Sequence, residues 1–480
     1  MAPPGGHTTQ CPRPGGQFSG GHGPTVDARP GGSGHLAGHE EKRGPDPQPN
    51  PAAPEPRRPH HPALADTIRF ACATALTGII AGLVGLACIH ILHSLTALVW
   101  DAHSGTLLEA VEAAPWWKRV AVLAASGAIG GISWTLLFRS NKDVVSVARC
   151  VQGESMPVVR ALWHALTQIG VVALGASVGR EVAPREVAAS LSAWMGDRLG
   201  LSPRDRRIIV TCGAGAGLAA VYSIPLSGAV YTLEILLVGM SARACAAALA
   251  ASGIAVLVST GWARPEPFYT VPDLSPSLSL TVWAAVFGAV IGWLGWAFKG
   301  AVAAASGARP RSARLLWTLP VAFTAVGALS VWVPSVLGNG QASAQTQFDA
   351  AWADGAGLAV AALVLAAKAV ATLVTIRAGA WGGVLTPAVA LGAGLGALSG
   401  LAWSQAWPGS PVAAYVFIGA AVFLGASMDA PFTGLVLVAE FTQQGAGILV
   451  PAIVATASAT AASALARALR SGRGPGRGPR

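Results

Sequence analysis

Long runs of apolar residues recur along this chain and constrain its fold more than any other feature. Three examples are residues 120–138, 280–298 and 358–375, each about as long as a helix that crosses a bilayer. Only 11% of the 480 residues are charged, whereas soluble domains carry about 25%. The 59 glycines suit close packing between transmembrane helices. The sequence therefore predicts an all-α polytopic membrane protein.

The two ends of the chain differ from this apolar middle. Residues 1–62 are rich in Gly, Pro, His and charge, a composition that cannot bury a core, so we expect a disordered tail there. A membrane domain is expected over 63–470, followed by a short flexible basic tail over 471–480. The net charge of +10 is concentrated at the ends and in short loops. This distribution favours insertion in the cell membrane with both termini cytoplasmic, and it argues against a role in binding nucleic acid.

Within the membrane domain, apolar segments of two kinds alternate. Long spans are expected at 68–99, 118–138, 158–178, 243–262, 280–299, 313–334, 357–378 and 448–469. Shorter or Gly/Pro-interrupted pieces lie at 186–199, 208–221, 225–239, 384–402, 411–427 and 431–443. The second group is too short or too broken to span comfortably, which predicts helices that end inside the membrane.

An internal repeat divides the domain into two related halves. The stretches "LAAVYSIPLSGAVYTLEI" (218–235) and "LGASMDAPFTGLVLVAEF" (424–441) are identical at six of 18 positions, including a Pro, a Gly and a Glu. We therefore expect two repeats, at approximately 118–260 and 313–470. The recurring Glu234 and Glu440 are interpreted mainly as structural acceptors for buried N–H groups.

Each half also contains one conspicuous interruption, "GREVAP" (179–184) in the first and "GGVLTP" (382–387) in the second. Interrupted segments at matching places in two halves are the best pointer in a sequence to a transporter's binding site. Both interruptions contain Gly and end in a Pro suited to the first turn of a helix. Two helix N-termini that converge inside the membrane would form an anion site, because their free N–H groups carry partial positive charge.

The interruption in the first half carries charges in an otherwise apolar stretch. A carboxylate at a helix N-terminus is itself an anion, so Glu181 could occupy the site in place of a substrate and leave when protonated or displaced. Alternatively, Glu181 caps its helix or pairs with Arg180. Ionisable residues inside a membrane are costly, which favours the functional interpretation. Glu186 is expected to pair locally with Arg185 or to cap a helix turn.

With these motifs, the chain resembles the CLC family of chloride channels and chloride/proton exchangers. "GREVAP" resembles the family's GREGP loop with its gating glutamate, and "GGVLTPAVALGAG" (382–394) resembles its GxFxP segment. Residues 213–236 and 421–442 resemble two further family stretches. The resemblance implies a fold of two inverted repeats with broken helices, a homodimer, and a gate at Glu181. It implies anion contacts from Gly179, Arg180, Val182, Gly383, Val384, Leu385 and Thr386, with the amides of Val384 and Leu385 facing the anion.

Several residues depart from the family pattern. In "QGESMP" (152–157), Glu154 falls where the resemblance implies a Ser that contacts the anion; either Glu154 is protonated or paired, with Arg160 as a candidate partner, or a shifted loop presents Ser155. The final segment lacks the family's late Tyr. Ile235 stands where exchangers carry a second glutamate. These losses remove side-chain contacts but leave the backbone contacts intact.

The sequence therefore favours membrane transport of small inorganic anions, with chloride first and fluoride or another anion open. The rival hypotheses are a chloride/proton antiporter and a non-transporting scaffold that kept the fold. An enzyme is not expected, because no catalytic triad, HExxH motif or phosphate loop is found. In the apolar run "RALWHALTQ", His164 is expected to be a packed histidine. The expected partners are an anion, protons in the antiporter alternative, the lipid bilayer and a second copy of the chain; no cofactor or metal is expected.

Overall fold

The computed structural model describes residues 64–102, 106–139, 144–261, 263, 266–310, 312–349 and 357–471. Helices account for nearly all regular structure in these ranges, and the β pairing found in them is an isolated bridge between Gly179 and Gly383. The predicted all-α fold class is confirmed. The predicted N-terminal tail (1–62) and all but one residue of the C-terminal tail (471–480) lie outside the described residues.

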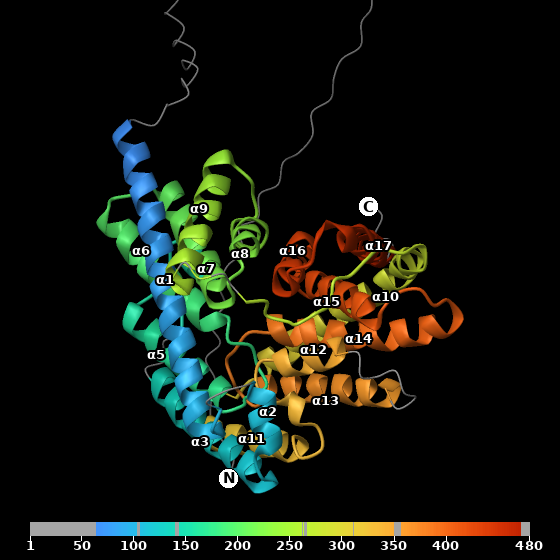
Figure 1. Ribbon diagram of the computed structural model, residues 1–480. Coiled ribbons are helices and arrows are strands. Elements are labelled where there is room, and N and C mark those ends of the chain that lie inside the picture. Colours follow the sequence, from blue (N-terminus) through green and yellow to red (C-terminus); the bar gives the residue numbers. More distant parts are fainter. Residues whose placement is uncertain are drawn as a thin grey trace, which may run out of the picture. The chain divides into compact units, whose positions relative to one another are not determined.

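The helices follow the predicted segments closely (Figure 1). The first part of the chain forms α1 (Leu64–Trp100), α2 (Leu107–Ala113), α3 (Trp116–Phe138), α4 (Val147–Val151), α5 (Val158–Ala173), α6 (Val182–Arg198), α7 (Pro203–Tyr222), α8 (Pro225–Tyr231), the π-helical turn η1 (Thr232–Leu237) and α9 (Ala242–Thr260). The second part forms α10 (Leu278–Gly307), the 3-10 turn η2 (Ser312–Arg314), α11 (Leu315–Leu329), the 3-10 turn η3 (Pro334–Val336), α12 (Gln341–Phe348), α13 (Gly357–Arg377), α14 (Leu385–Ala406), α15 (Val412–Met428), α16 (Pro431–Thr442) and α17 (Ala446–Ser471).

Seven of the described helices are long and apolar enough to cross a membrane: α1, α3, α9, α10, α13, α14 and α17. Two predicted spans were too long. Helix α5 stops at Ala173 because Gly175 turns the chain with a φ of +105°, and α11 stops at Leu329 shortly before Pro334. The piece expected to be broken at 384–402 is instead the unbroken 22-residue helix α14. In an apolar 18-residue stretch of α14, 72% of the residues are buried, compared with 39% in such a stretch of α1. Helix α14 is therefore an interior helix.

Neighbouring helices pack through small side chains. Helix α1 packs against α6, α7 and α9, α3 packs against α11, and α10 packs against α15 and α17 (Figure 1). Helices α14 and α15 approach closely at Gly392, where an added Cβ would lie 2.5 Å from the carbonyl oxygen of Gly419. The largest apolar cluster lies around α14, α15 and α16 and includes the fully buried Trp283, Phe417 and Phe441. This packing leaves the lipid-facing sides of the outer helices apolar and exposed.

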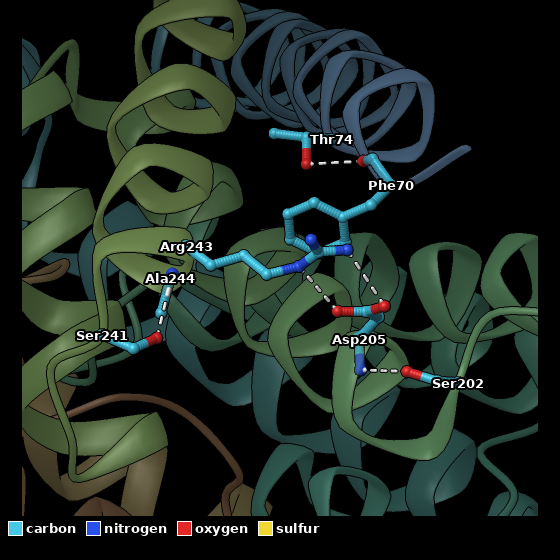
Figure 2. Close-up of polar contacts among 7 residues, drawn as sticks. All are labelled: Phe70, Thr74, Ser202, Asp205, Ser241, Arg243 and Ala244. Atoms are coloured by element: carbon cyan, nitrogen blue, oxygen red, sulfur yellow. Dashed lines mark hydrogen bonds and ion pairs between the residues drawn. The ribbon is translucent and has the colours of Figure 1, made fainter. Parts of the chain in front are cut away.

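Contacts of one arginine connect the ends of α1, α7 and α9 in the first part of the chain (Figure 2). The guanidinium of Arg243, at the start of α9, donates two hydrogen bonds of 2.9 and 3.1 Å to the carboxylate of Asp205 on α7. The same guanidinium lies 3.9 Å from the ring centroid of Phe70 on α1. The Ser202 hydroxyl accepts from the Asp205 N–H and caps α7, so the carboxylate is held in position.

The two aligned sequence stretches take the same local structure. Helix α7 ends at a residue in the left-handed conformation, Ser223 (φ 58°), and α8 begins two residues later at Pro225. Helix α15 ends in the same way at Asp429 (φ 53°), and α16 begins at Pro431. Because the breaks coincide with the aligned residues, the sequence similarity between these stretches reflects a shared conformation.

The two repeated glutamates cap each other's helices reciprocally. The Glu440 carboxylate accepts hydrogen bonds from the N–H of Leu226 and from the N–H and hydroxyl of Ser227, in the first turn of α8. The Glu234 carboxylate accepts from the N–H of Phe432 and from the N–H and hydroxyl of Thr433, in the first turn of α16. The interpretation of both glutamates as structural acceptors for N–H groups is confirmed.

Candidate functional site

The two interrupted loops meet in the structure. The N–H of Gly179 donates to the carbonyl oxygen of Gly383 at 2.7 Å, and the N–H of Gly383 donates back to Gly179 at 2.9 Å. These two glycines, 204 residues apart in the chain, form a short antiparallel bridge that joins the halves. Helices α6 and α14 begin directly after this bridge, at Val182 and Leu385. Their N-termini therefore converge, as the repeated interruptions predict.

The carboxylate of Glu181 lies at this convergence and is fully buried. Its Oε1 accepts a 2.7 Å hydrogen bond from the N–H of Leu385, the first residue of α14. Its Oε2 accepts a longer bond of 3.4 Å from the hydroxyl of Tyr222, the last residue of α7. Glu181 is the N-cap residue of α6, but its side chain makes no capping bond to that helix. The carboxylate thus crosses from one half to the helix end of the other.

The bridge glycines make room for this carboxylate. An added Cβ at Gly383 would lie 1.8 Å from Oε1 of Glu181, and one at Gly179 would lie 2.1 Å from Oε2. Only residues without a side chain leave space for an acceptor group this close to the backbone. The two interruptions therefore carry glycine at these positions because a negatively charged group occupies the space beside them.

Neutral donors surround the carboxylate. The first-turn amides of α14 supply partial positive charge, and the contact through Leu385 N–H is the type that helix N-termini offer to anions. Val384 is the N-cap residue of α14. The side chain of Thr386 is fully buried and lies next to the Tyr222 hydroxyl. Such a set can bind a small anion with amide and hydroxyl groups.

The two arginines of the first loop face aromatic rings. The Arg180 guanidinium lies 5.0 Å from the ring centroid of Tyr222 and 5.7 Å from that of Phe268. The Arg185 guanidinium lies 4.7 Å from the ring centroid of Tyr231. Both arginines are partly buried. They add positive potential around Glu181, but the hydrogen bonds described for its carboxylate come from Leu385 and Tyr222, so the structure does not pair Glu181 with Arg180.

Glu154 and Ser155 are not brought together with Glu181. Both are exposed, and the Glu154 carboxylate forms a hydrogen-bonded ion pair with Arg149 on α4, with a 2.6 Å contact from Nε. The suggested partner Arg160 instead donates to the carbonyl oxygen of Leu137. Arg160 was the wrong partner to suggest. The turn after α4, with Gly153 at a φ of 102°, folds the chain back and brings Glu154 to Arg149.

Glu186 was also assigned the wrong partner. It lies on α6 and contacts Nδ1 of His164 on α5 at 2.6 Å, whereas Arg185 turns toward Tyr231. Residues 185 and 186 are neighbours in sequence, but consecutive residues of a helix point about 100° apart and do not face each other. His164 is fully buried, as expected for a packed histidine, and it also has an ionisable partner.

Sequence reasoning missed Tyr222. Its hydroxyl is one of two donors within hydrogen-bond distance of the Glu181 carboxylate among the described contacts. The available signal was its position directly before the break between α7 and α8, in a stretch aligned with the second half. The matching position in the second half is Met428, so the repeat itself gave no reason to expect a hydroxyl there.

Residues 134–464 match the family described as voltage gated chloride channel. A ClcB-like chloride channel protein of Ralstonia nicotianae is 31% identical over 386 residues, covering 76% of this chain and 88% of that protein. The voltage-gated ClC-type chloride channel ClcB of Salmonella typhi is 27% identical over 402 residues, covering 79% of this chain and 93% of that protein.

Two solved structures share the fold. The X-ray structure of a slow cyanobacterial Cl−/H+ antiporter superposes with a TM-score of 0.71 at 17% identity, covering 83% of this chain and 94% of that one. The structure of a CLC-type fluoride/proton antiporter gives a TM-score of 0.64 at 19% identity, covering 83% and 95%. The fold and its apolar helices define a multi-pass membrane protein of the channel and transporter class. The chain belongs to the voltage-gated chloride channel family.

Proposed function

We propose that this protein moves small inorganic anions, chloride foremost, across the membrane through the site at the N-termini of α6 and α14, with Glu181 as the gate. The observation that carries the proposal is the 2.7 Å hydrogen bond from the Leu385 N–H to the Glu181 carboxylate. A carboxylate from one half already occupies the helix end of the other half. A halide has the same charge and accepts hydrogen bonds from the same donors.

The proposed gate acts by competition. While Glu181 is ionised and in place, it holds the Leu385 N–H and fills the space beside Gly179 and Gly383. Protonation removes the charge that the helix ends attract, and rotation of the side chain frees the donors. The vacated space suits one partly dehydrated anion, bound by neutral groups weakly enough to leave again.

The proposed anion site consists of backbone and side-chain groups from both loops. Its members are Gly179, Arg180, Val182, Gly383, Val384, Leu385 and Thr386, to which the structure adds the Tyr222 hydroxyl as a candidate. Glu154 and Ser155 remain candidate contacts for an anion that approaches the site from the exposed loop after α4. Chloride is the proposed substrate because the two relatives named above are described as chloride channels.

The proposed organisation follows the repeat. Two inverted repeats at approximately 118–260 and 313–470 make one pathway in a membrane domain spanning 63–470, and two copies of the chain form a homodimer. The reciprocal contacts of Glu234 and Glu440 support a twofold relation between the halves. We place the protein in the cell membrane with both termini in the cytoplasm, on the basis of the basic residues at the chain ends.

A chloride/proton antiporter is the second candidate. One solved structure with this fold is described as a Cl−/H+ antiporter, and Glu181 is a titratable group inside the proposed anion site. Ile235, which follows the structural acceptor Glu234, is apolar and offers no second proton acceptor at that position. We therefore rank anion movement without obligatory proton exchange first.

The test is anion efflux from liposomes that contain the purified full-length chain. A chloride electrode records efflux from the parent protein, from Glu181→Ala and from Gly170→Ala, a control whose new methyl group would meet no atom within 4 Å. We expect efflux from the parent and the control, and a changed rate and pH dependence in Glu181→Ala. Uphill proton movement driven by a chloride gradient would select the antiporter. No efflux from any of the proteins would favour the non-transporting scaffold.

A further inference from the structure

A second buried titratable group lies behind the proposed gate. His164 is fully buried and Glu186 is 6% exposed. The Glu186 Oε2 lies 2.6 Å from the His164 Nδ1. We propose that His164 and Glu186 form a second proton-binding site, whose protonation changes the affinity of the anion site at Glu181. This inference rests on the proposed function for its effect on anions, but not for the binding of the proton.

The contacts of the imidazole fit two protonation states. The amide nitrogen of Gln168 lies 2.8 Å from the same Nδ1 that Glu186 contacts. An amide nitrogen only donates, whereas a carboxylate only accepts. When Nδ1 carries no proton it can accept from Gln168, and when it carries one it can donate to Glu186. The Nδ1 atom therefore has a partner whether or not it carries a proton.

The Gln168 amide can change its orientation when the proton moves. Its Oε1 is buried and makes no hydrogen bond among the described residues. A half-turn of the amide would bring Oε1 to Nδ1, so that a protonated imidazole could donate to it as well as to Glu186. The pair thus holds one proton with no net charge, whether that proton is on the imidazole or on the carboxyl group. A second proton makes the pair positive.

The pair is connected to both loops of the anion site. Glu186 follows Glu181 by five residues on α6, which is about 7.5 Å along the helix axis. The ring of Trp381 packs edge-on against the His164 ring, with centroids 5.4 Å apart. Trp381 directly precedes Gly382 and Gly383 of the second loop. A charge at His164 is therefore felt by the donors of both halves.

A buried lysine in the second half provides a comparison. Lys368 on α13 is fully buried, and its side-chain nitrogen donates to the Ser177 hydroxyl and to the carbonyl oxygens of Val336 and Gly338. No carboxylate appears among these contacts. The described residues thus hold Lys368 with neutral acceptors, whereas His164 has a carboxylate partner.

Other charged groups around the pair have partners of their own. Arg160, on α5, donates to the Leu137 carbonyl oxygen of α3. From α3, the group facing the imidazole is the uncharged ring of Trp134, with centroids 6.4 Å apart. From the second loop it is Trp381, whose ring Arg309 covers at 4.8 Å from the centroid.

The helices packed against α6 also carry ionisable groups. From α4, Arg149 pairs with Glu154, and from α7, Arg206 pairs with Asp197 at the far end of α6. Two further histidines of α1, His90 and His93, have exposed side chains. On the first loop itself, the guanidiniums of Arg180 and Arg185 lie over aromatic rings. None of these groups has a contact with the imidazole among the described interactions, so Glu186 is the ionisable group that sets its protonation.

The effect on an anion can be isolated by removing the gate. In the parent, a proton gained by the pair makes it less negative, which favours both the anion and the ionised Glu181, so the two effects oppose each other. In Glu181→Gln only the anion responds. A unit charge at about 10 Å in a medium of effective dielectric constant about 20 changes anion occupancy roughly tenfold.

The experiment compares chloride affinity and efflux of Glu181→Gln between about pH 8 and pH 5, the range in which histidine normally changes charge. We expect affinity to rise roughly tenfold on acidification. Adding His164→Lys keeps a donor for Glu186 and replaces the imidazole with an ammonium group, whose charge the adjacent carboxylate stabilises over this range. This double variant should lose the pH response while it keeps its fold and transport. Adding His90→Gln instead should leave the response unchanged. A response that persists in the His164→Lys double variant would overturn the proposal.

A second measurement does not depend on transport activity. The imidazole nitrogens of 15N-histidine-labelled protein are followed by NMR across the same pH range, and the His164 signal is assigned by its loss in His164→Lys. We expect that signal to change across this range in the parent and to follow a different pH dependence in Glu186→Gln, because that variant removes the charged partner of the imidazole. If no protein transports anions, this titration still tests the pair. A His164 signal that does not change with pH would refute the second proton-binding site.

Discussion

A methyl group at residue 383 tests whether the Glu181 carboxylate occupies the place that an anion takes. The new Cβ in Gly383→Ala would lie 1.8 Å from Oε1 and 2.1 Å from Cδ of Glu181. Since real Cβ atoms essentially never show contacts under 3.0 Å, the carboxylate must withdraw. Glu181 is a flexible side chain and can do so in the parent. An anion in the same place would have to withdraw as well.

The size of the effect follows from the lost hydrogen bond. The Leu385 N–H donates to the carboxylate at 2.7 Å, and a shift that relieves the methyl contact breaks this bond. Hydrogen bonds to charged groups contribute about 1.5–3 kcal/mol. Since about 1.4 kcal/mol is a factor of ten, we expect chloride affinity to fall about tenfold to hundredfold when Gly383→Ala is added to Glu181→Ala.

Isothermal titration of chloride into the detergent-purified variants measures this affinity directly. The matched control adds Gly170→Ala to Glu181→Ala, since a methyl group there meets no atom within 4 Å. We expect the control to bind chloride as Glu181→Ala does. If Gly383→Ala leaves the affinity of Glu181→Ala unchanged, the carboxylate and the anion occupy different places, and the competition between them is wrong.

Three further substitutions test other parts of the structure. Tyr222→Phe removes the 3.4 Å hydroxyl contact to Glu181, and we expect anion efflux to change by about twofold to fivefold, because so long a hydrogen bond contributes about 1 kcal/mol or less; an unchanged rate would remove the hydroxyl from the site. Arg243→Ala removes both hydrogen bonds to Asp205 and should lower the free energy of unfolding by about 2 kcal/mol, measured by thermal unfolding in detergent, with anion selectivity unchanged. Glu440→Gln should destabilise by about 1–3 kcal/mol, because the first-turn N–H groups of α8 lose a charged acceptor; an unaltered melting temperature would show that water replaces the carboxylate there.

The sequence predicted the parts of the site that depend on local backbone chemistry. Gly179 and Gly383 mark loops in which a side chain would collide with another group, and the following prolines mark helix starts. Because these constraints are local and occur twice, comparing the two halves was enough to find the two loops. The breaks at Pro225 and Pro431 were visible for the same reason.

Partners on neighbouring helices could not be predicted in this way. His164 and Glu186 are 22 residues apart on α5 and α6, and Tyr222 is 41 residues from Glu181. Which side chains meet depends on the rotation of each helix about its axis and on which helices become neighbours, and neither follows from one sequence. Glu154 shows the same dependence on local contacts, because the turn after α4 brings it to Arg149, whereas the suggested partner Arg160 donates to Leu137.

The reciprocal contacts of Glu234 and Glu440 have a consequence for synthesis in the cell. The carboxylate that accepts from Ser227 is made 213 residues after it, and Thr433, which donates to Glu234, is made 199 residues after that glutamate. At about 5–20 residues per second, ribosomes need about 10–40 s to make that length. During this interval the first-turn amides of α8 lack their carboxylate acceptor. The start of α8 therefore reaches its final hydrogen bonding only after nearly the whole second half has been made.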